Sequence, residues 1–274
     1  MISIGSSVSD LYSSLANGGD KRIQHLPLMR DPLSVHLIVV IYIVFVTRLG
    51  PWLMSFKNEP FQLRRPLLAY NLAMMFYNFC TWFASGTFGW WNHYSLQCQP
   101  LEEGYSREAI GMAYNAYFFW FSKVVELMDT VFFVLRKKNN QLTGLHVWHH
   151  SFMVISYYWG IKYYPGGHGS FVGFLNSGVH VIMYGYYFLS ALGPAIQRHL
   201  WWKKYLTSIQ MIQFAVIFIH SLQLIFLRRC NVPSSITYYT MFNTVVFLIL
   251  FREFFITAYK NTCSRRLERP KKDA

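Results

Sequence analysis

Charged side chains are scarce in this sequence, and acidic side chains are the scarcest. Only 14% of the 274 residues are charged, and Asp and Glu together number 12, against 25 Lys and Arg. Hydrophobic residues make up 53% of the chain and aromatic residues 19%. A soluble globular protein carries about 25% charged residues, so the composition excludes that class. The chain also shows no internal repeat, and its first residues lack the basic and then apolar order of a cleavable signal peptide.

The apolar residues are grouped into blocks of the length that crosses a membrane. About 20 apolar residues span the hydrocarbon core as a helix, and the sequence contains seven such blocks. They are approximately Pro32 to Met54, Leu67 to Trp91, Ile110 to Leu135, Leu145 to Tyr164, Ser170 to Leu192, Tyr205 to Leu227 and Ser234 to Tyr259. We therefore predict an all-α, multi-pass membrane protein. Its single seven-helix transmembrane domain covers residues 32–259, between an N-terminal segment, 1–31, and a basic tail, 260–274.

Basic residues predict the orientation of the chain in the membrane. Seven spans put the two ends of the chain on opposite sides, and most Lys and Arg fall on the side of the odd-numbered connections and the tail. Cytosolic connections carry an excess of Lys and Arg, which puts the tail in the cytosol and the N-terminal segment on the luminal side. The net charge of +13 is thus first a sign of topology and only second a hint of a polyanionic ligand.

Two further features predict the compartment. Cys98 follows the second span and Cys230 follows the sixth, so both lie on the non-cytosolic side, where a disulfide can persist. We predict a bond between these two cysteines. Lys271 and Lys272 are the fourth and third residues counted from the C-terminus. This position matches the dilysine retrieval signal of endoplasmic-reticulum membrane proteins, an address read by a receptor. The predicted location is the membrane of the endoplasmic reticulum.

Three histidines stand close together near the start of the fourth block, in His146-Val147-Trp148-His149-His150. Their spacing of i, i+3 and i+4 puts all three imidazoles on one face of a helix. Ionisable groups inside a membrane are expensive and are generally functional. These histidines therefore either bind a metal or carry out nucleophilic and acid–base chemistry next to the lipid.

The two neighbouring blocks also contain polar residues. In the third block Lys123, Glu126 and Asp129 step by three and share a broad helix face. Each charge costs about 2.5–3.5 kcal/mol at the membrane centre, so each needs a partner. Two interpretations stay open: an ion-pair ladder that only fixes helix packing, or a group that supports the histidines or the substrate. In the fifth block, His180 follows Asn176 by four residues and lies in the span adjacent to the histidine cluster.

A basic loop leads from the third block into the histidine cluster. Arg136, Lys137 and Lys138 begin it and Gln141 follows, which puts positive charge where a phosphate-bearing substrate would reach the imidazoles. A loop of this kind is most often only a topology anchor. A nucleotide-carried acyl group would nevertheless suit it, with the phosphates at the surface and the acyl tail in the bilayer.

The metal interpretation needs more ligands than the chain places together. His-x-x-His-His is one of the histidine boxes of membrane di-iron desaturases and hydroxylases, and imidazole suits iron. Such a centre needs further histidine boxes on the same side of the membrane, and the chain has ten histidines in all. His168 falls on the luminal side and His220 stands by itself in the sixth block, so only the cluster and His180 remain close together. The ligand count argues against a di-iron centre, while a single-metal site stays open.

Taken together, the motifs resemble those of the very-long-chain fatty acid elongases, the membrane-embedded 3-ketoacyl-CoA synthases. The resemblance covers nearly the whole chain, and the motifs follow one another in the family's order. They are Lys123 to Thr130 (KVVELMDT), Arg136 to Lys138 (RKK), Gln141 to Thr143 (QLT), His146 to His150 (HVWHH), Asn176 to Tyr184 (NSGVHVIMY) and Leu200 to Thr207 (LWWKKYLT).

This resemblance implies a fold and a reaction. The fold is seven transmembrane helices, six of which form an inverted barrel around a long substrate tunnel, with the first helix packed outside. The reaction is a decarboxylative Claisen condensation of a long-chain acyl-CoA with malonyl-CoA, the first step of fatty acid elongation. The products are a 3-oxoacyl-CoA longer by two carbons, free CoA and carbon dioxide. No metal and no other cofactor is implied.

The resemblance also implies roles for individual residues. His149 would be the nucleophile that takes the acyl group as an acyl-imidazole, and His180 would polarise the malonyl thioester. His146 and His150 would orient His149 and shuttle protons. The residues implied to contact CoA and its thioester arm are Lys123, Arg136, Lys138, Gln141, Tyr186, Lys203, Thr207, Gln210 and Arg265. The residues implied to support these groups from behind are Glu126, Asp129 and Asn176.

Three classes of function make different predictions. An elongase depends on malonyl-CoA and needs neither oxygen nor iron. A metal-dependent membrane acyl desaturase or hydroxylase depends on oxygen and loses activity with chelators. A lipid or metabolite transporter gives no reason for three clustered imidazoles beside a basic loop. We prefer the elongase interpretation, whose partners are acyl-CoA, malonyl-CoA, membrane lipids and other enzymes of the elongation cycle. A homo-oligomer is compatible with it, and no feature indicates a nucleic acid.

Overall fold

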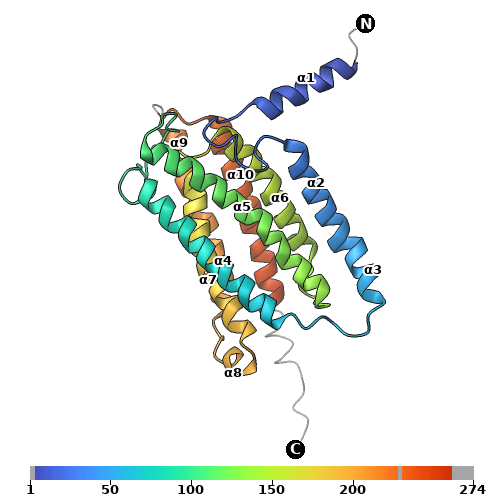
Figure 1. The fold of residues 1–274 in the computed structure, drawn as a ribbon. Coiled ribbons are helices and arrows are strands. Elements are labelled where there is room, and N and C mark those ends of the chain that lie inside the picture. Colours follow the sequence, from blue (N-terminus) through green and yellow to red (C-terminus); the bar gives the residue numbers. More distant parts are fainter. Residues whose placement is uncertain (1–3, 228–229, 261–274) are drawn as a thin grey trace, which may run out of the picture.

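The computed structural model describes residues 4–227 and 230–260, and in this part of the chain every regular element is helical. The prediction of an all-α protein is therefore confirmed for the described residues. Three predicted functional residues, Arg265, Lys271 and Lys272, lie outside them. The long helices run side by side in one bundle, while the first helix projects away from it (Figure 1).

Each block predicted from hydropathy corresponds to one continuous run of helix. Some runs contain a π-helical turn, written η. The elements are α1 (Ile4–Asn17), α2 (Pro32–Val44), η1 (Phe45–Leu49), α3 (Gly50–Ser55), α4 (Arg64–Ser85), η2 (Gly86–Trp90), α5 (Arg107–Leu135), α6 (Gly144–Tyr163), α7 (Ser170–Ala191), α8 (Pro194–Gln197), α9 (Lys203–Phe226), α10 (Ser234–Phe255) and η3 (Ile256–Lys260).

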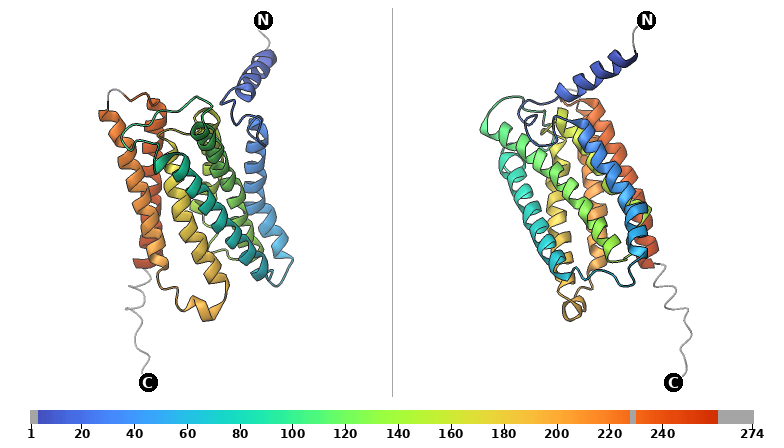
Figure 2. Two further views of the ribbon diagram at one scale, coloured as in Figure 1. Left: turned by 60° about the vertical axis from the view of Figure 1, so that its left-hand side comes forward. Right: turned by 45° about the vertical axis from the view of Figure 1, so that its right-hand side comes forward.

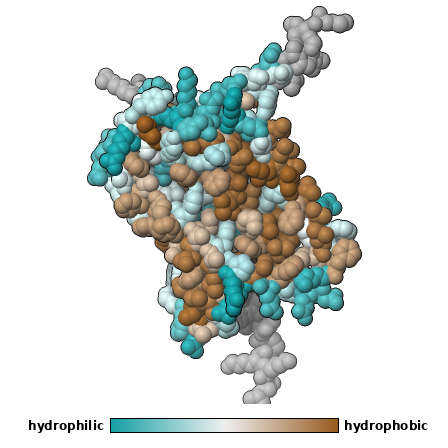
Figure 3. Space-filling model, viewed as in Figure 1, coloured by the Kyte–Doolittle hydropathy of each residue, from teal (hydrophilic) through white to brown (hydrophobic). Residues whose placement is uncertain are grey.

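Three of these runs in the described residues are long and apolar enough to cross a membrane. They are Pro32–Ser55, Lys203–Phe226 and Ser234–Ala258. Membrane crossing by the runs of α4, α5, α6 and α7 stays a prediction. On the face shown in Figure 3, hydrophobic residues gather over the middle of the molecule and hydrophilic residues gather at its two ends. These features are those of a multi-pass membrane protein.

The two ends of the bundle differ in chemistry. α6 begins and α10 ends at the same end, which we call the histidine end because the His146–His150 cluster lies in the first turns of α6. We call the opposite end, where Cys98 and Cys230 are bonded, the disulfide end. The first described helix, α1, lies at the disulfide end and η3 lies at the histidine end (Figure 1).

Helix packing divides the bundle into an inner and an outer part. α4 packs along α7, α9 along α10, and α5 between α4 and α6. All six of these helices contribute residues to one internal cavity. α2 packs against α6 and α3 against α5 from outside (Figure 2), and neither contributes to the cavity lining.

The buried face of α2 is fixed by a stripe that hydropathy does not reveal. Val35, Val39, Tyr42 and Val46 are buried at spacings of four, three and four residues, which is one face of a helix. The opposite face is equally apolar and is exposed. Since lipid is as apolar as these side chains, close packing and hydrogen bonds decide which face turns inward. The hydroxyl group of Tyr42 makes such a bond, to Thr130 of α5.

Capping residues start the helices that carry the polar motifs. Thr143 Oγ1 accepts the backbone N–H of His146 at 3.2 Å and thereby starts α6 immediately before the histidine cluster. Ser106 Oγ accepts the N–H of Ala109 at 3.0 Å at the start of α5. Such caps satisfy N–H groups that have no partner within the helix. The capped first turn of α6 fixes the direction in which the cluster enters the bundle.

The N-terminal segment is docked on the disulfide end. Arg22 pairs with Asp20 at 2.6 Å and also donates to the carbonyl oxygen of Glu102. The Asp20 carboxylate raises the pKa of the Arg22 guanidinium above its ordinary value. Lys162, near the end of α6, donates to the carbonyl oxygen of Met29 at 2.7 Å. These contacts attach residues 20–29 to the ends of α5 and α6.

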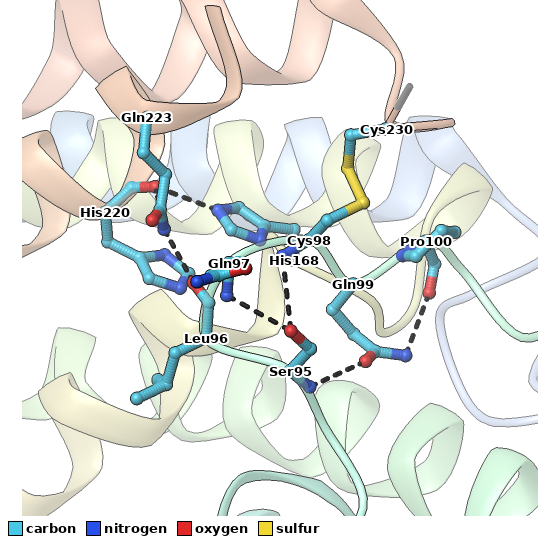
Figure 4. Close-up of a disulfide and its surroundings, with 10 residues drawn as sticks. All are labelled: Ser95, Leu96, Gln97, Cys98, Gln99, Pro100, His168, His220, Gln223 and Cys230. Carbon is cyan, nitrogen blue, oxygen red and sulfur yellow. Dashed lines mark hydrogen bonds between the residues drawn. A yellow bond between two sulfur atoms is a disulfide. The ribbon is translucent and has the colours of Figure 1, made fainter. Parts of the chain in front are cut away.

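A disulfide and two histidines hold the connections at this end together (Figure 4). Cys98, between η2 and α5, is bonded to Cys230, between α9 and α10, which is the pair that the sequence predicts. The N–H of His168 donates to the carbonyl oxygen of Gln99 at 2.6 Å. The interpretation that His220 stands by itself is wrong, because its ring is stacked on that of His168 with the centroids 3.8 Å apart. Residues 132 positions apart in sequence are thus joined where the bundle closes.

Candidate active site

Lys123 and Glu126 form a buried ion pair in the middle of α5. Their exposed fractions are 2% and 3%, and Lys123 Nζ lies 2.8 Å from Glu126 Oε1. Lys123 also donates to Asn176 Oδ1 on α7 at 2.8 Å. The pair is therefore more than a ladder within one helix, because it binds the neighbouring helix that carries His180.

Glu126 also binds the imidazole of His180. Glu126 Oε1 lies 3.1 Å from His180 Nδ1. An ionised carboxylate can only accept hydrogen bonds, so Nδ1 carries the hydrogen and Nε2 carries the lone pair. Lys123 Nζ donates to the same carboxylate oxygen, and the hydroxyl group of Ser122 lies 3.4 Å from it. Glu126 thus sets both the tautomer and the orientation of His180.

Asp129 belongs to a different contact. Its Oδ2 accepts a hydrogen bond from the hydroxyl group of Tyr184 on α7 at 2.7 Å. The ring of Tyr184 lies 6.0 Å from that of His180. Asp129 therefore supports the α7 side of the site through Tyr184, and Glu126 is the partner of Lys123.

The three clustered histidines face two directions. Spacings of i, i+3 and i+4 spread their side chains over about 100° of the helix circumference. His146 Nε2 lies 3.0 Å from Thr130 Oγ1 on α5, and the His146 and His150 rings are 4.3 Å apart. His149 packs against Phe247 of α10, with centroids 4.8 Å apart. His146 thus turns toward α5, whereas His149 turns toward α10.

His149 lines an internal cavity of about 140 Å³. The buried Nδ1 atom of His149 has no hydrogen-bond partner in the described part of the chain. The lining includes residues of α6 from His149 to Ile161, which at 1.5 Å per residue is a length of about 18 Å. Asn176 lines the cavity as well, and the aromatic walls near His149 are Phe152, Phe214 and Phe247. A long, mostly apolar space therefore begins at an imidazole and extends toward the disulfide end.

The comparisons with known proteins agree with this arrangement. Residues 27–266 match the model of the GNS1/SUR4 (ELO) family. The chain belongs to this family. It is 44% identical to very long chain fatty acid elongase 1 of Mus musculus over 264 residues, which is 96% of this chain and 93% of the mouse protein. It is also 44% identical to very long chain fatty acid elongase 7 of Drosophila melanogaster over 243 residues, 89% of this chain and 74% of the fly protein.

Family membership confirms the resemblance seen in the sequence motifs and does not favour the metal-dependent alternative. A relative from Homo sapiens, very long chain fatty acid elongase 1, is also 44% identical over 96% of this chain. None of these three relatives is named as a desaturase or hydroxylase.

Most residues implied to contact CoA lie at the histidine end of this ELO-family bundle. Lys138, Gln141 and Lys203 are exposed, and Arg136 is half-buried. Deeper residues make contacts with neighbouring helices: Thr207 is buried, Gln210 Nε2 lies 3.6 Å from Met183 Sδ, and the Tyr186 ring lies 4.9 Å from that of Trp202. Lys123 is the exception, because its ammonium group is buried with Glu126 and Asn176 instead of facing the basic surface.

Sequence reasoning missed several residues that bind the site. The hydroxyl group of Tyr42 hydrogen-bonds to Thr130, and Thr130 hydrogen-bonds to His146. The ring of Phe247 packs against that of His149. The one sequence feature that could have indicated a role for Tyr42 is its hydroxyl group, which stands in a nearly continuous apolar run. No spacing rule connects a residue of α2 or α10 with α6, because their contact depends on how distant helices pack.

Proposed function

We propose that the protein condenses a long-chain acyl-CoA with malonyl-CoA, giving a 3-oxoacyl-CoA longer by two carbons, CoA and carbon dioxide. The main supporting observation is His149, an imidazole that opens on a long apolar cavity at the basic end of an ELO-family bundle. An apolar space of this kind suits an acyl chain, and an imidazole suits acyl transfer. The names of the relatives, very long chain fatty acid elongases, support the same reaction.

In the first half-reaction, His149 attacks the thioester. A lone pair of its neutral imidazole forms a bond to the acyl carbon, the carbon–sulfur bond breaks, and CoA leaves as a thiolate that takes a proton from water. The other ring proton of His149 passes to a base, for which the Nε2 lone pair of His180 is suited. Covalent transfer replaces one difficult step by two easier ones. The aromatic walls around His149 keep water away from the acyl-imidazole.

In the second half-reaction, malonyl-CoA loses carbon dioxide and becomes a nucleophile. His180, now protonated on both nitrogens and paired with Glu126, donates from Nε2 to the developing enolate oxygen of the thioester. The enolate carbon then bonds to the acyl carbon, and the bond to His149 breaks. His149 recovers its proton from His180, so the site returns to its starting state. His146 and His150 support these proton movements from the same helix face.

The basic surface at the histidine end is the proposed CoA site. Lys138 and Lys203 are exposed there, and together with Arg136 they would hold the phosphates. The acyl chain would then extend into the cavity past His149. Raising ionic strength should weaken the binding of both CoA substrates, because exposed charges are screened.

The membrane arrangement is part of the same proposal. Helices α4 to α7, α9 and α10 form a six-helix inverted barrel around the cavity, with the run from α2 to α3 outside it, and residues 32–259 form one catalytic domain. The cavity lining and the outer position of α2 support this. The chain lies in the endoplasmic reticulum membrane with the disulfide end and N-terminal segment in the lumen and the tail in the cytosol. The disulfide supports that orientation, since the lumen is oxidising.

The test is mass spectrometry of the purified protein with a long-chain acyl-CoA alone and then with malonyl-CoA. We expect an acyl mass on the His149 peptide, which malonyl-CoA discharges as the two-carbon-longer 3-oxoacyl-CoA. If the product forms without an adduct, condensation stands and the acyl-imidazole does not. If neither forms over a range of chain lengths, the proposed function is wrong.

Two variants sharpen this assay. His149→Ala should form no adduct. His180→Ala should form it slowly, because the ring proton of His149 loses its acceptor, and should fail to discharge it to product. An adduct that persists in His149→Ala and is absent from His180→Ala would transfer the role of nucleophile to His180. His199→Ala, in the connection between α8 and α9, is the control for losing a histidine outside the cluster.

A further inference from the structure

A line of hydrogen bonds connects the outer helix with the histidine cluster. The Tyr42 hydroxyl oxygen on α2 lies 2.7 Å from Thr130 Oγ1 on α5, and Thr130 Oγ1 lies 3.0 Å from His146 Nε2 on α6. Tyr42 is 5% exposed and Thr130 is fully buried. Three helices thus meet at one hydroxyl group, although α2 contributes no residue to the cavity.

The direction of these hydrogen bonds follows from a count of donors and acceptors. In the described residues, the Tyr42 hydroxyl group has no side-chain hydrogen-bond partner besides Thr130, and the Thr130 hydroxyl group has none besides Tyr42 and His146. If Tyr42 donates to Thr130 and Thr130 donates to Nε2, both hydroxyl hydrogens have acceptors. If instead His146 donates from Nε2, either Tyr42 or Thr130 is left with a buried hydrogen that has no acceptor. Buried polar groups are almost always satisfied, which selects the first arrangement.

We propose that Tyr42, acting through Thr130, holds His146 in the tautomer whose ring hydrogen is on Nδ1, with Nε2 as a hydrogen-bond acceptor. Tyr42 and Thr130 are then positioning residues, and the helix outside the barrel takes part in the chemistry without touching substrate. The proposal rests on the proposed function, in which His146 supports proton movement beside His149. A histidine can do this only from a defined tautomer, since one ring nitrogen must donate and the other must accept.

The position of Tyr42 explains why its hydroxyl group sets the direction of the hydrogen bond between Thr130 and His146. Without the hydrogen of Tyr42, Thr130 Oγ1 is free to accept from Nε2–H of His146 while its own hydrogen turns elsewhere. His146 would then be divided between two tautomers, and part of the protein would be unproductive. The ring of Tyr42 and its packing against α5 and α6 would be unchanged, because Phe fills the same space.

The test compares Tyr42→Phe with Tyr158→Phe in the full chain in lipid bilayers. Tyr158 is a matched control, since it is buried and donates one hydrogen bond, to the carbonyl oxygen of Met29, away from the cluster. We expect Tyr42→Phe to lower kcat about tenfold, the lower end of the effects seen for residues that orient metal-binding histidines, with little change in the KM for either CoA substrate. Tyr158→Phe should keep the kcat of the unmodified protein.

A spectroscopic measurement reads the tautomer directly. Solid-state NMR of protein labelled with ¹⁵N-histidine, with the His146 signals assigned by their loss in His146→Gln, should show hydrogen on Nδ1 and none on Nε2. Tyr42→Phe should move hydrogen to Nε2 in part of the population. Thr130→Ser should behave as the unmodified protein, and Thr130→Val should resemble Tyr42→Phe.

Each outcome decides the proposal. An Nδ1–H tautomer that Tyr42→Phe leaves unchanged would overturn it, as would a Thr130→Val variant as active as Thr130→Ser. A shifted tautomer with unchanged kcat would also overturn it, because His146 would then need no fixed tautomer. If the unmodified protein does not condense its substrates, the proposed function fails by itself, and the NMR result still decides whether Tyr42 controls His146.

Discussion

Glu126 and His180 are buried and form a hydrogen bond between two helices, with Glu126 Oε1 3.1 Å from His180 Nδ1. The same carboxylate oxygen lies 2.8 Å from Lys123 Nζ. Glu126 therefore balances a buried positive charge and orients an imidazole at once. This double role makes its removal informative, because the effects on stability and on catalysis can be separated.

Glu126→Gln should abolish most of the condensation activity and destabilise the fold. Lys123 would lose its charged partner, and breaking a buried pair by removing one member costs about 3–5 kcal/mol. The double variant Lys123→Met/Glu126→Gln should recover much of that stability but not the activity, because His180 would still lack its carboxylate. Thermal unfolding and product formation measure the two effects. Glu253→Gln, which removes an exposed ion pair with Arg252, is the control, and a fully active double variant would contradict the assigned role of Glu126.

Phe247→Ala should shorten the lifetime of the acyl-enzyme. The Phe247 ring packs 4.8 Å from that of His149, and its loss would admit water beside the acyl-imidazole. We expect a severalfold rise in free fatty acid relative to condensation product, measured by chromatography after incubation with acyl-CoA and malonyl-CoA together. Phe242→Ala, on the same helix but 68% exposed, should leave this ratio unchanged. Equal ratios in both variants would mean that Phe247 does not protect the intermediate.

Gln213→Leu should improve the binding of saturated acyl-CoA. Gln213 lines the cavity with an exposed fraction of 5%, and its buried Oε1 has no hydrogen-bond partner in the described residues. An alkyl chain in contact with this amide displaces its water and forms no hydrogen bond in return. Leaving the amide without hydrogen bonds costs about 1–3 kcal/mol. Leu removes that penalty, so KM for a saturated chain should fall by about fivefold or more, with kcat little changed. An unchanged KM would show that the acyl chain does not reach Gln213.

Acid should remove a stabilising contribution from Asp31, which lies outside the membrane-spanning segments. Hydrogen bonds from the Ser34 and Tyr12 hydroxyl groups and from the Leu33 N–H lower the pKa of Asp31. The unfolded value is about 3.9, so the folded carboxylate binds its proton less readily. The contribution is therefore complete above the unfolded pKa and is lost as pH falls through the folded pKa.

Thermal unfolding between pH 7 and pH 2.5 tests this prediction. Asp31→Asn keeps a helix-capping side chain but cannot ionise, so its deficit in melting temperature should be constant near neutrality and shrink toward the acidic end. Asp10→Asn, in α1, is the control for losing one carboxylate from the N-terminal segment. A deficit that stays the same across the whole range would show that the charge of Asp31 contributes nothing.

The course of the helices could be predicted from sequence because it depends on short-range properties. Blocks such as Ser170 to Leu192 are bounded by polar or turn-forming residues, and a helix satisfies its own backbone inside a membrane. The end of the bundle at which each helix begins follows from counting spans. The spacing of His146, His149 and His150 is likewise a property of one helix.

The partners of the polar residues could not be predicted in the same way. The contact of Lys123 with CoA and its thioester arm stays a prediction, while the structure adds that its ammonium group binds Glu126 and Asn176, partners that its spacing does not reveal. His220 was expected to be isolated and is stacked on His168. In each case the partner lies on another helix, whose rotation and neighbours no local pattern records.

The sequence by itself determined which segments are helical, which family they form and which imidazoles lie within one turn of each other, since these depend on residues near in the chain. Only the tertiary structure decided that His149 opens on the cavity, that Glu126 fixes His180, and that Tyr42 reaches toward the histidine cluster from outside. The physical reason is that a membrane helix is apolar on all sides. Its inward face is chosen by packing and by a few buried hydrogen bonds, which exist only once the helices have met.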